Sequence, residues 1–194
     1  MANVKDFKDT EGNWVYRFQN GKERLFTRAG MLYHALRQRV NPNGKKQQQS
    51  PLYVGCYSSF EDFQDFTDWC QTQAGYHEGF HLDKDLLTRG NKEYGKQTCV
   101  FLPQEVNKLL TKRDRFRGEY PIGVSADRGS IRASCQVGIG KAKVLGYFKT
   151  PEEAFAVYKA FKEAHMKTVA AKWRSQIDPR AYEALMAYEV LITD

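Results

Sequence analysis

The stretch of residues 80–110 restricts the fold of this chain more than any other. His81, Asp83 and Asp85 alternate with leucine and lysine, so in a strand with a period of two their side chains all lie on one face. Carboxylates and an imidazole on one face can bind a metal ion or carry protons. The same pattern is also typical of an ordinary solvated strand face, and both interpretations stay open.

The remainder of this stretch predicts a returning strand and a helix. Residues 88–92 include a Gly-Asn pair and are typical of a loop in which the chain reverses. Residues 98–102 are the returning strand in this prediction, and Pro103 suits the first position of a helix that carries apolar residues and Asn107. The predicted order is strand, loop, strand and helix.

The first 50 residues predict a hairpin, a helix and a loop. Apolar runs flank residues 19–22, and the Asn-Gly pair between them is a strong hairpin signal. Helical spacing starts at Thr27 and ends before Asn41. Residues 45–51 are polar and without a pattern, which predicts a loop.

Aromatic side chains recur at three- and four-residue steps across residues 60–70. This spacing predicts a helix, and either Ser58 or Ser59 can cap it. The aromatic face is most simply core. We expect it to pack on residues 80–110, because one hairpin and one helix alone bury too little surface.

The order of elements in residues 80–110, with Asn91 in the loop and Asn107 on the helix, resembles the ββα-metal core of HNH endonucleases. The degenerate versions found in tailed phages are the nearest in pattern. In that family a histidine on the first strand is the general base, a loop asparagine holds the backbone, and a helix residue joins the metal. The resemblance implies that the catalytic residues are His81, Asp83, Asp85, Asn91 and Asn107.

The same resemblance implies a metal site without its usual base. Asp83, Asp85 and Asn107 offer hard oxygen ligands suited to Mg²⁺ or Mn²⁺, and a protein that does not cut needs no cofactor. The family's Asp-His pair is Asp83-Lys84 here, and a protonated lysine has no lone pair with which to accept a proton. Either His81 replaces the base or the site is inactive.

The charge of the chain favours a polyanionic partner. The formal net charge is +7 and the sequence pI is about 9.2, values most simply explained by nucleic acid binding. The four cysteines have no CxxC spacing, which indicates neither a zinc site nor a disulfide framework. The sequence has no apolar run typical of a signal peptide or a membrane helix. We therefore expect a cytoplasmic protein with no membrane partner, and the sequence does not indicate its oligomeric state.

Residues 111–120 are basic and poor in apolar anchors, and we interpret them as a linker. The cations of this linker are Lys112, Arg113, Arg115 and Arg117. Such a linker can lie along a phosphate backbone, where it releases counterions and makes the affinity depend on salt. The alternative is a solvated connector without a binding role.

The pattern then changes to short strands. Residues 131–137 alternate between apolar and polar side chains, which predicts one buried and one open face. Strands at residues 122–124 and 143–148 complete a three-stranded antiparallel sheet in this prediction. Thr150 and Glu153 form a capping box, with proline after the cap, and open a helix that covers one face.

A set of residues in this second region carries a further resemblance: Gly123, Val124, Ala133, Leu145, Gly146, Phe148, Thr150, Glu152, Glu153, Ala154, Ala156 and Tyr158. With these residues the region resembles the plant ethylene-response-factor (Apetala-type) DNA-binding domain. In that family the open sheet face enters the major groove of DNA. The resemblance implies DNA contacts from Arg128, Arg132, Ser134, Gln136, Lys141 and Lys143. Val144 stands where the family has a tryptophan, and arginines are few, which predicts weak base specificity.

Together these patterns predict an α+β chain in four parts. Residues 1–110 form a degenerate HNH-like, ββα-metal-like module, and residues 111–120 form the basic linker. Residues 121–168 form a three-stranded antiparallel sheet packed on a helix, and residues 169–194 form a helical extension for packing or oligomerisation.

The pair of resemblances predicts a phage-encoded DNA-binding protein related to HNH homing endonucleases, present in the cytoplasm of the infected bacterium. Its partner is double-stranded DNA, bound through the basic linker and the sheet. One alternative is an active homing or nicking endonuclease that depends on Mg²⁺ or Mn²⁺. A second alternative is an interaction module that binds a host protein.

Overall fold

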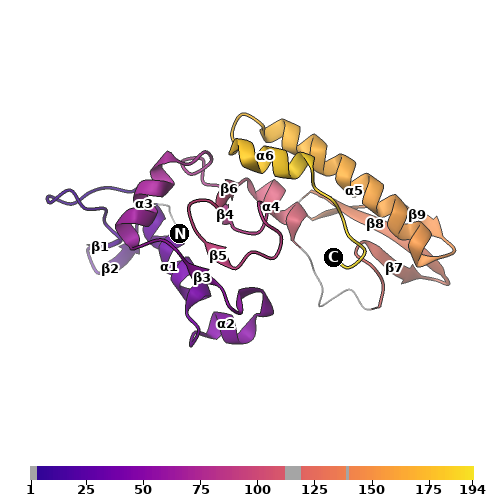
Figure 1. Ribbon diagram of the computed structural model, residues 1–194, viewed down its shortest axis with the longest axis horizontal. Coiled ribbons are helices and arrows are strands. Elements are labelled where there is room, and N and C mark those ends of the chain that lie inside the picture. Colours follow the sequence, from indigo (N-terminus) through magenta and orange to yellow (C-terminus); the bar gives the residue numbers. More distant parts are fainter. Residues whose placement is uncertain (1–3, 112–118, 139) are drawn as a thin grey trace. The chain divides into compact units, whose positions relative to one another are not determined.

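The computed structural model describes residues 4–111, 119–138 and 140–194 (Figure 1). It confirms the predicted α+β class and divides into two compact units, unit 1 (Met1–Phe101) and unit 2 (Leu102–Asp194). The helices are α1 (Arg28–Val40), α2 (Lys45–Gln49), the 3-10 helix η1 (Pro51–Tyr53), α3 (Phe63–Thr72), α4 (Gln104–Leu110), α5 (Pro151–Trp173) and α6 (Pro179–Met186). The strands are β1 (Arg17–Asn20), β2 (Glu23–Phe26), β3 (Tyr57–Ser58), β4 (His81–Asp83), β5 (Glu93–Tyr94), β6 (Val100–Leu102), β7 (Val124–Asp127), β8 (Ser130–Gly138) and β9 (Lys141–Phe148). Of the helices in these ranges, none has both the length and the apolar character needed to cross a bilayer.

β1 and β2 form the predicted N-terminal hairpin, and the chain passes from it directly into α1. Asn20 pairs with Glu23 across the two-residue turn. Thr27 caps α1, because its hydroxyl accepts from the N–H of Gly30 at 3.1 Å while it donates to the carbonyl of Val15 at 2.7 Å. The hairpin and the start of this helix are therefore confirmed.

The prediction of a loop over residues 45–51 is wrong, because α2 and η1 occupy this segment. Gln47 on α2 is buried although it is polar. Its side-chain amide donates to the carbonyl of Arg39 at 3.0 Å and to that of Cys56 at 2.9 Å. These tertiary hydrogen bonds satisfy the buried amide and fix a short helix that has no apolar periodicity of its own.

The predicted caps of the next helix, Ser58 and Ser59, are also wrong. Asp62 caps α3, and its carboxylate accepts from the N–H of Asp65 at 2.9 Å. The helix therefore begins at Phe63, three residues after the start of the aromatic pattern.

The aromatic face of α3 forms the core of unit 1, as predicted. The ring of Phe60, just before the helix, lies 5.0 Å from Phe66 and 5.1 Å from Trp69, measured between centroids. Trp69 in turn stacks on Phe101 of β6 at 5.7 Å. The aromatic face thus packs on the stretch of residues 80–110.

The predicted order of strand, loop, strand and helix is present, with one addition. β4 pairs with β6. Between the predicted loop at residues 88–92 and the predicted strand at residues 98–102, β5 pairs in parallel with β3, with Tyr57 opposite Glu93. Two-residue strands carry too little pattern for the sequence to reveal this pair.

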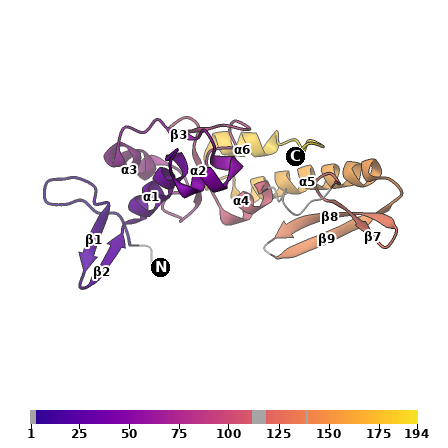
Figure 2. The same ribbon diagram turned by 90° about the horizontal axis from the view of Figure 1, so that it is seen from below.

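In unit 2, β7, β8 and β9 form the predicted antiparallel sheet, and α5 covers one face of it (Figure 2). Thr150 accepts from the N–H of Glu153 at 3.2 Å, and the Glu153 carboxylate accepts from the N–H of Thr150 at 3.3 Å. The capping box is therefore confirmed. α6 packs on α5, and its buried Ala181 and Leu185 make it a packing element.

α4 packs on α5 and β8 in unit 2, whereas the sequence grouped it with the first module. Lys162 of α5 is buried, and its ammonium donates to the carbonyl of Leu109 at 2.7 Å. Burial lowers the pKa of Lys162. Glu105, in the first turn of α4, accepts from the ammonium of Lys172 at 2.6 Å and from the indole of Trp173 at 2.8 Å. These contacts hold both ends of α4 on α5.

Candidate functional site

The face of the β7–β9 sheet opposite α5, called the open face below, carries polar side chains at alternate positions of β8. Ala133 and Cys135 are buried under α5. The residues that alternate with these two along β8 are Arg132, Ser134 and Gln136. Their side chains therefore project from the opposite, open face, where they are partly exposed. The predicted alternation of β8 is confirmed, and the open face presents donors and acceptors to solvent.

A β-bulge in β9 changes what the open face presents. Ala133 pairs with Gly146 and the next residue, Ser134, pairs with Val144, so Leu145 is one extra residue on β9. Leu145 packs against the core beneath α5. A bulge of this kind shifts the alternation of all following side chains by one position.

The bulge brings Tyr147 onto the open face, which the sequence analysis missed. Tyr147 lies directly opposite Arg132 and is 59% exposed, and Val144 is 49% exposed. Strict alternation from Val144 would have turned Phe148 outward, but Phe148 packs toward the core. Gly146, with φ at +154°, was the available signal, because glycine inside a strand often marks a bulge.

Arg132 is held by a neighbouring strand rather than directed freely into solvent. One of its terminal nitrogens donates to the Asp127 carboxylate at 3.1 Å. Its Nε is buried and has no hydrogen-bond partner within the described ranges. Ion pairs this exposed contribute up to about 1 kcal/mol, so a ligand can replace Asp127 at little cost.

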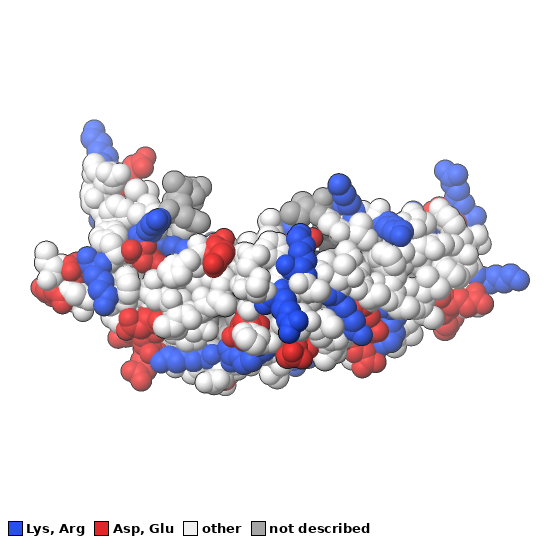
Figure 3. Space-filling view, turned by 90° about the horizontal axis from the view of Figure 1, so that it is seen from above, with Lys and Arg blue, Asp and Glu red and all other residues white. Residues whose placement is uncertain are grey.

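The rim of the open face carries two exposed cations, Arg128 in the β7–β8 turn and Lys141 at the start of β9. Neither forms an ion pair with another described residue. Lys143 was predicted as a DNA contact alongside them. It lies opposite buried Cys135 in the strand register, and its ammonium lies 5.0 Å from the ring centroid of Phe161. Lys143 therefore belongs to the helix side of the sheet. Figure 3 shows Lys and Arg interspersed with Asp and Glu on the visible surface rather than gathered into one patch.

In unit 1, the expected row of His81, Asp83 and Asp85 on one strand face is wrong, because β4 ends at Asp83. The Asp83 carboxylate accepts from the N–H of Asp85 at 3.0 Å and of Leu86 at 2.8 Å, which turns the chain away from the strand. Burial raises the pKa of Asp83, and the two N–H donors oppose this rise. Asp83 therefore acts as a turn residue here.

Lys84, at the position where the HNH resemblance would put the general base, has a structural role. Its side chain is 4% exposed, and its ammonium donates to the Asp85 carboxylate and to the carbonyl of Asn91. It also lies 5.8 Å from the ring centroid of Tyr94. The ammonium thus ties the two ends of the loop together.

Asn91 completes the same loop. Its amide donates to the carbonyls of Lys84 at 2.8 Å and Glu93 at 2.7 Å, and its oxygen accepts from the N–H of Glu93 at 3.0 Å. All three bonds hold backbone, which is the role that the HNH resemblance implies for this residue.

The remaining predicted site residues are His81, from the catalytic set, and Asn107, from both the catalytic and the metal set, and they belong to different units. His81 is exposed at the first position of β4, and Asn107 belongs to α4 of unit 2. Among described side chains, no three of His, Cys, Asp and Glu form a group that could hold a metal ion. The carboxylates of Asp83 and Asp85 are already bonded to N–H groups and an ammonium, so as they stand they do not fit a metal site.

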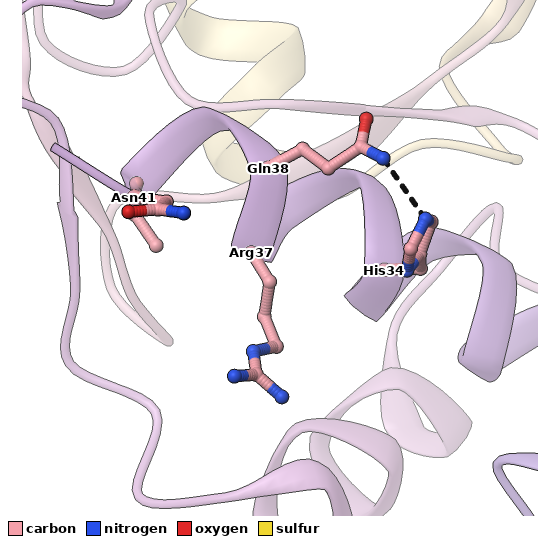
Figure 4. A pocket seen from close by; sticks show the side chains of 5 residues that line it. His34, Arg37, Gln38 and Asn41 are labelled. Carbon is pink, nitrogen blue, oxygen red and sulfur yellow. Dashed lines mark hydrogen bonds between the residues drawn. The ribbon is translucent and has the colours of Figure 1, made fainter. Parts of the chain in front are cut away.

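A depression in unit 1 lies along α1 and was not predicted (Figure 4). It is lined by His34, Arg37, Gln38, Val40 and Asn41. The Gln38 amide lies 2.9 Å from His34 Nε2, and the other ring nitrogen of His34 lies 3.1 Å from the Tyr16 hydroxyl. Both ring nitrogens of His34 therefore have partners, and the depression offers one guanidinium and two amides without a converging catalytic set.

No protein-family model, curated protein or solved structure matches this chain. The HNH and ethylene-response-factor resemblances therefore stay predictions from the sequence. Lys112, Arg113, Arg115 and Arg117 of the predicted linker lie outside the described residues.

Proposed function

We propose that this protein binds double-stranded DNA through the open face of the β7–β9 sheet. The observation that carries the proposal is the difference between the two faces of β8. Ala133 and Cys135 are buried on one face, whereas Arg132 and Gln136 stand on the other and are partly exposed. Arginine and glutamine are the side chains that bind guanine and adenine edges in the major groove.

The charge of unit 2 supports an anionic partner. Its sequence holds sixteen Lys and Arg against eleven Asp and Glu. Neutralised phosphates supply most of the affinity of sequence-independent DNA binding, and base contacts supply the specificity. With one arginine and one glutamine on the open face, we propose moderate affinity and a weak base preference. The cellular setting that goes with this proposal is the cytoplasm of a phage-infected bacterium.

We do not extend the proposal to DNA cleavage by unit 1. Lys84 is buried and donates to two acceptors, so it cannot serve as a base for the attacking water. The turn bonds of Asp83 also occupy a carboxylate oxygen that the family would use for the metal.

The proposal is tested with labelled duplexes and fluorescence anisotropy. Arg132→Ala and Gln136→Ala should each reduce discrimination between preferred and non-preferred duplexes by about 1–3 kcal/mol. Arg180→Ala is the matched control, because Arg180 also pairs with an aspartate, Asp178, but lies on α6. Equal binding by Arg132→Ala, Gln136→Ala and the parent protein to every duplex would show that the open face does not read DNA.

The salt dependence tests the phosphate contribution separately. The logarithm of affinity should fall linearly with the logarithm of salt concentration, with a slope of several units if roughly 5–8 phosphates are neutralised. Changing Arg113, Arg115 and Arg117 together to Ala should lower the slope, whereas changing Lys45 and Lys46 on α2 should not. A flat salt response would contradict DNA binding of this kind.

A further inference from the structure

We infer that Val144 and Tyr147 contact the 5-methyl group of thymine in the major groove, which makes thymine the base that the open face prefers. This inference rests on the proposed binding of duplex DNA by the same face. It adds the identity of the base and the residues that select it.

The two residues form the apolar part of an otherwise polar face. Val144 stands opposite Ser134 and Tyr147 opposite Arg132, so all four side chains share the open face. Val144 and Tyr147 remain about half exposed. The position of Tyr147 on this face depends on the extra residue, Leu145, in the bulge.

The Val144 side chain and the ring of Tyr147 gain nothing from phosphate, although the Tyr147 hydroxyl can donate to one. The apolar group that base edges present in the major groove is the thymine methyl, and small apolar side chains contact it. Ser134 and Arg132 are two residues apart on β8, a separation of roughly 6–7 Å. Their partners Val144 and Tyr147 therefore lie about two base steps apart, since bases in one strand rise by about 3.4 Å.

The polar neighbours fit the same base pairs. Gln136 is on the open face beyond Ser134, where its amide donates to the carbonyl of Gly138 at 3.2 Å. Once that bond is exchanged, a glutamine amide can bind both edge groups of adenine. A face that combines an amide with apolar side chains therefore matches A·T pairs better than G·C pairs. Arg132 can add a guanine contact at another base pair, because its exposed ion pair with Asp127 is replaced at little cost.

The test replaces thymine by deoxyuridine, which removes the methyl group and leaves every hydrogen-bonding group in place. Duplexes enriched from a random pool by the parent protein are synthesised again with deoxyuridine. Loss of one buried methyl contact, worth about 0.8 kcal/mol, corresponds to a loss of affinity of about four-fold. We expect at least this loss for the parent protein.

Val144→Ala supplies the internal control for folding. This variant should bind the deoxyuridine duplex with the affinity of the parent protein. The ratio of its affinities for the thymine and the deoxyuridine duplex should fall toward one. Val157→Ala is the matched control, because Val157 is also exposed, at 37%, but lies on α5. It should keep the thymine preference of the parent protein.

The outcomes separate this inference from the proposed function. If the parent binds duplex DNA but treats thymine and deoxyuridine alike, the inference is overturned and DNA binding stands. Retention of the full thymine preference by both Val144→Ala and Tyr147→Ala would also overturn it. If the parent binds no duplex at all, the proposed function itself fails.

Discussion

The loop of unit 1 yields a sharp prediction, because one side chain holds it at three points. Asn91→Ala removes the amide that bonds to the carbonyls of Lys84 and Glu93 and to the N–H of Glu93. Each such bond contributes about 1 kcal/mol net, and a partly buried group left without a partner costs about as much again. We expect the free energy of unfolding to fall by about 2–4 kcal/mol.

The measurement combines urea unfolding with amide hydrogen exchange. Unfolding of a two-unit chain need not be two-state, so exchange at the Glu93 amide supplies the local readout. In Asn91→Ala, the Glu93 amide should be the first to lose its protection against hydrogen exchange. The matched control is Asn107→Ala, since Asn107 makes no side-chain hydrogen bond within the described ranges and lies on a helix, where alanine is favourable.

A loss of less than about 1 kcal/mol in Asn91→Ala would refute this reasoning, because the three bonds would then be replaced by water at no cost. A large loss has a consequence for any cleavage assay. Inactivity of an Asn91 variant would follow from a broken loop and could not by itself assign Asn91 a catalytic role.

Three further predictions concern a buried lysine, the bulge and cleavage. Burial lowers the pKa of Lys162 in the folded state, so the unfolded state binds more protons between the lowered pKa and the ordinary value of about 10.4, and stability should rise with pH in that window. Lys162→Met should lack this rise in urea titrations at several pH values, whereas an unchanged pH slope would contradict it. Gly146→Ala should cost about 1–3 kcal/mol, because φ at +154° is unfavourable for other residues, whereas Gly138→Ala, which has open space around its Cβ position, should cost less. Equal thermal melting of the two variants would show that the bulge is not strained. Plasmid nicking with Mg²⁺ or Mn²⁺ should be absent or slow, and rapid nicking that survives His81→Ala and Asp83→Ala would show that the site lies on other residues.

Local signals in the sequence predicted much of the fold. The Asn-Gly turn, the capping box of Thr150 and Glu153, and the aromatic spacing of α3 each stabilise structure through neighbours in the sequence. Such signals need no knowledge of the tertiary structure. The sheet of unit 2 and the helix on it followed from them.

The errors arose where a tertiary contact decides the structure. Gln47 is buried because the carbonyls of Arg39 and Cys56 accept its two N–H bonds, which no pattern in residues 45–51 reveals. The sequence marks Lys84 only as the place where the base of the HNH resemblance is missing, whereas in the structure its ammonium holds the loop. Alternation predicts which face a side chain takes, but not which backbone group its polar end binds.

The candidate site shows how one residue decides what a surface offers. Strict alternation after Val144 would place Phe148 on the open face and bury Tyr147 under α5. The extra residue Leu145 exchanges these two rings, so a large apolar side chain fills the core and an amphipathic one faces solvent. Tyrosine is the better choice for that exposed position, since its hydroxyl stays hydrated while its ring contacts an apolar group. The bulge therefore serves the packing of unit 2 and the chemistry of the open face at once, and a change that removed it would alter both.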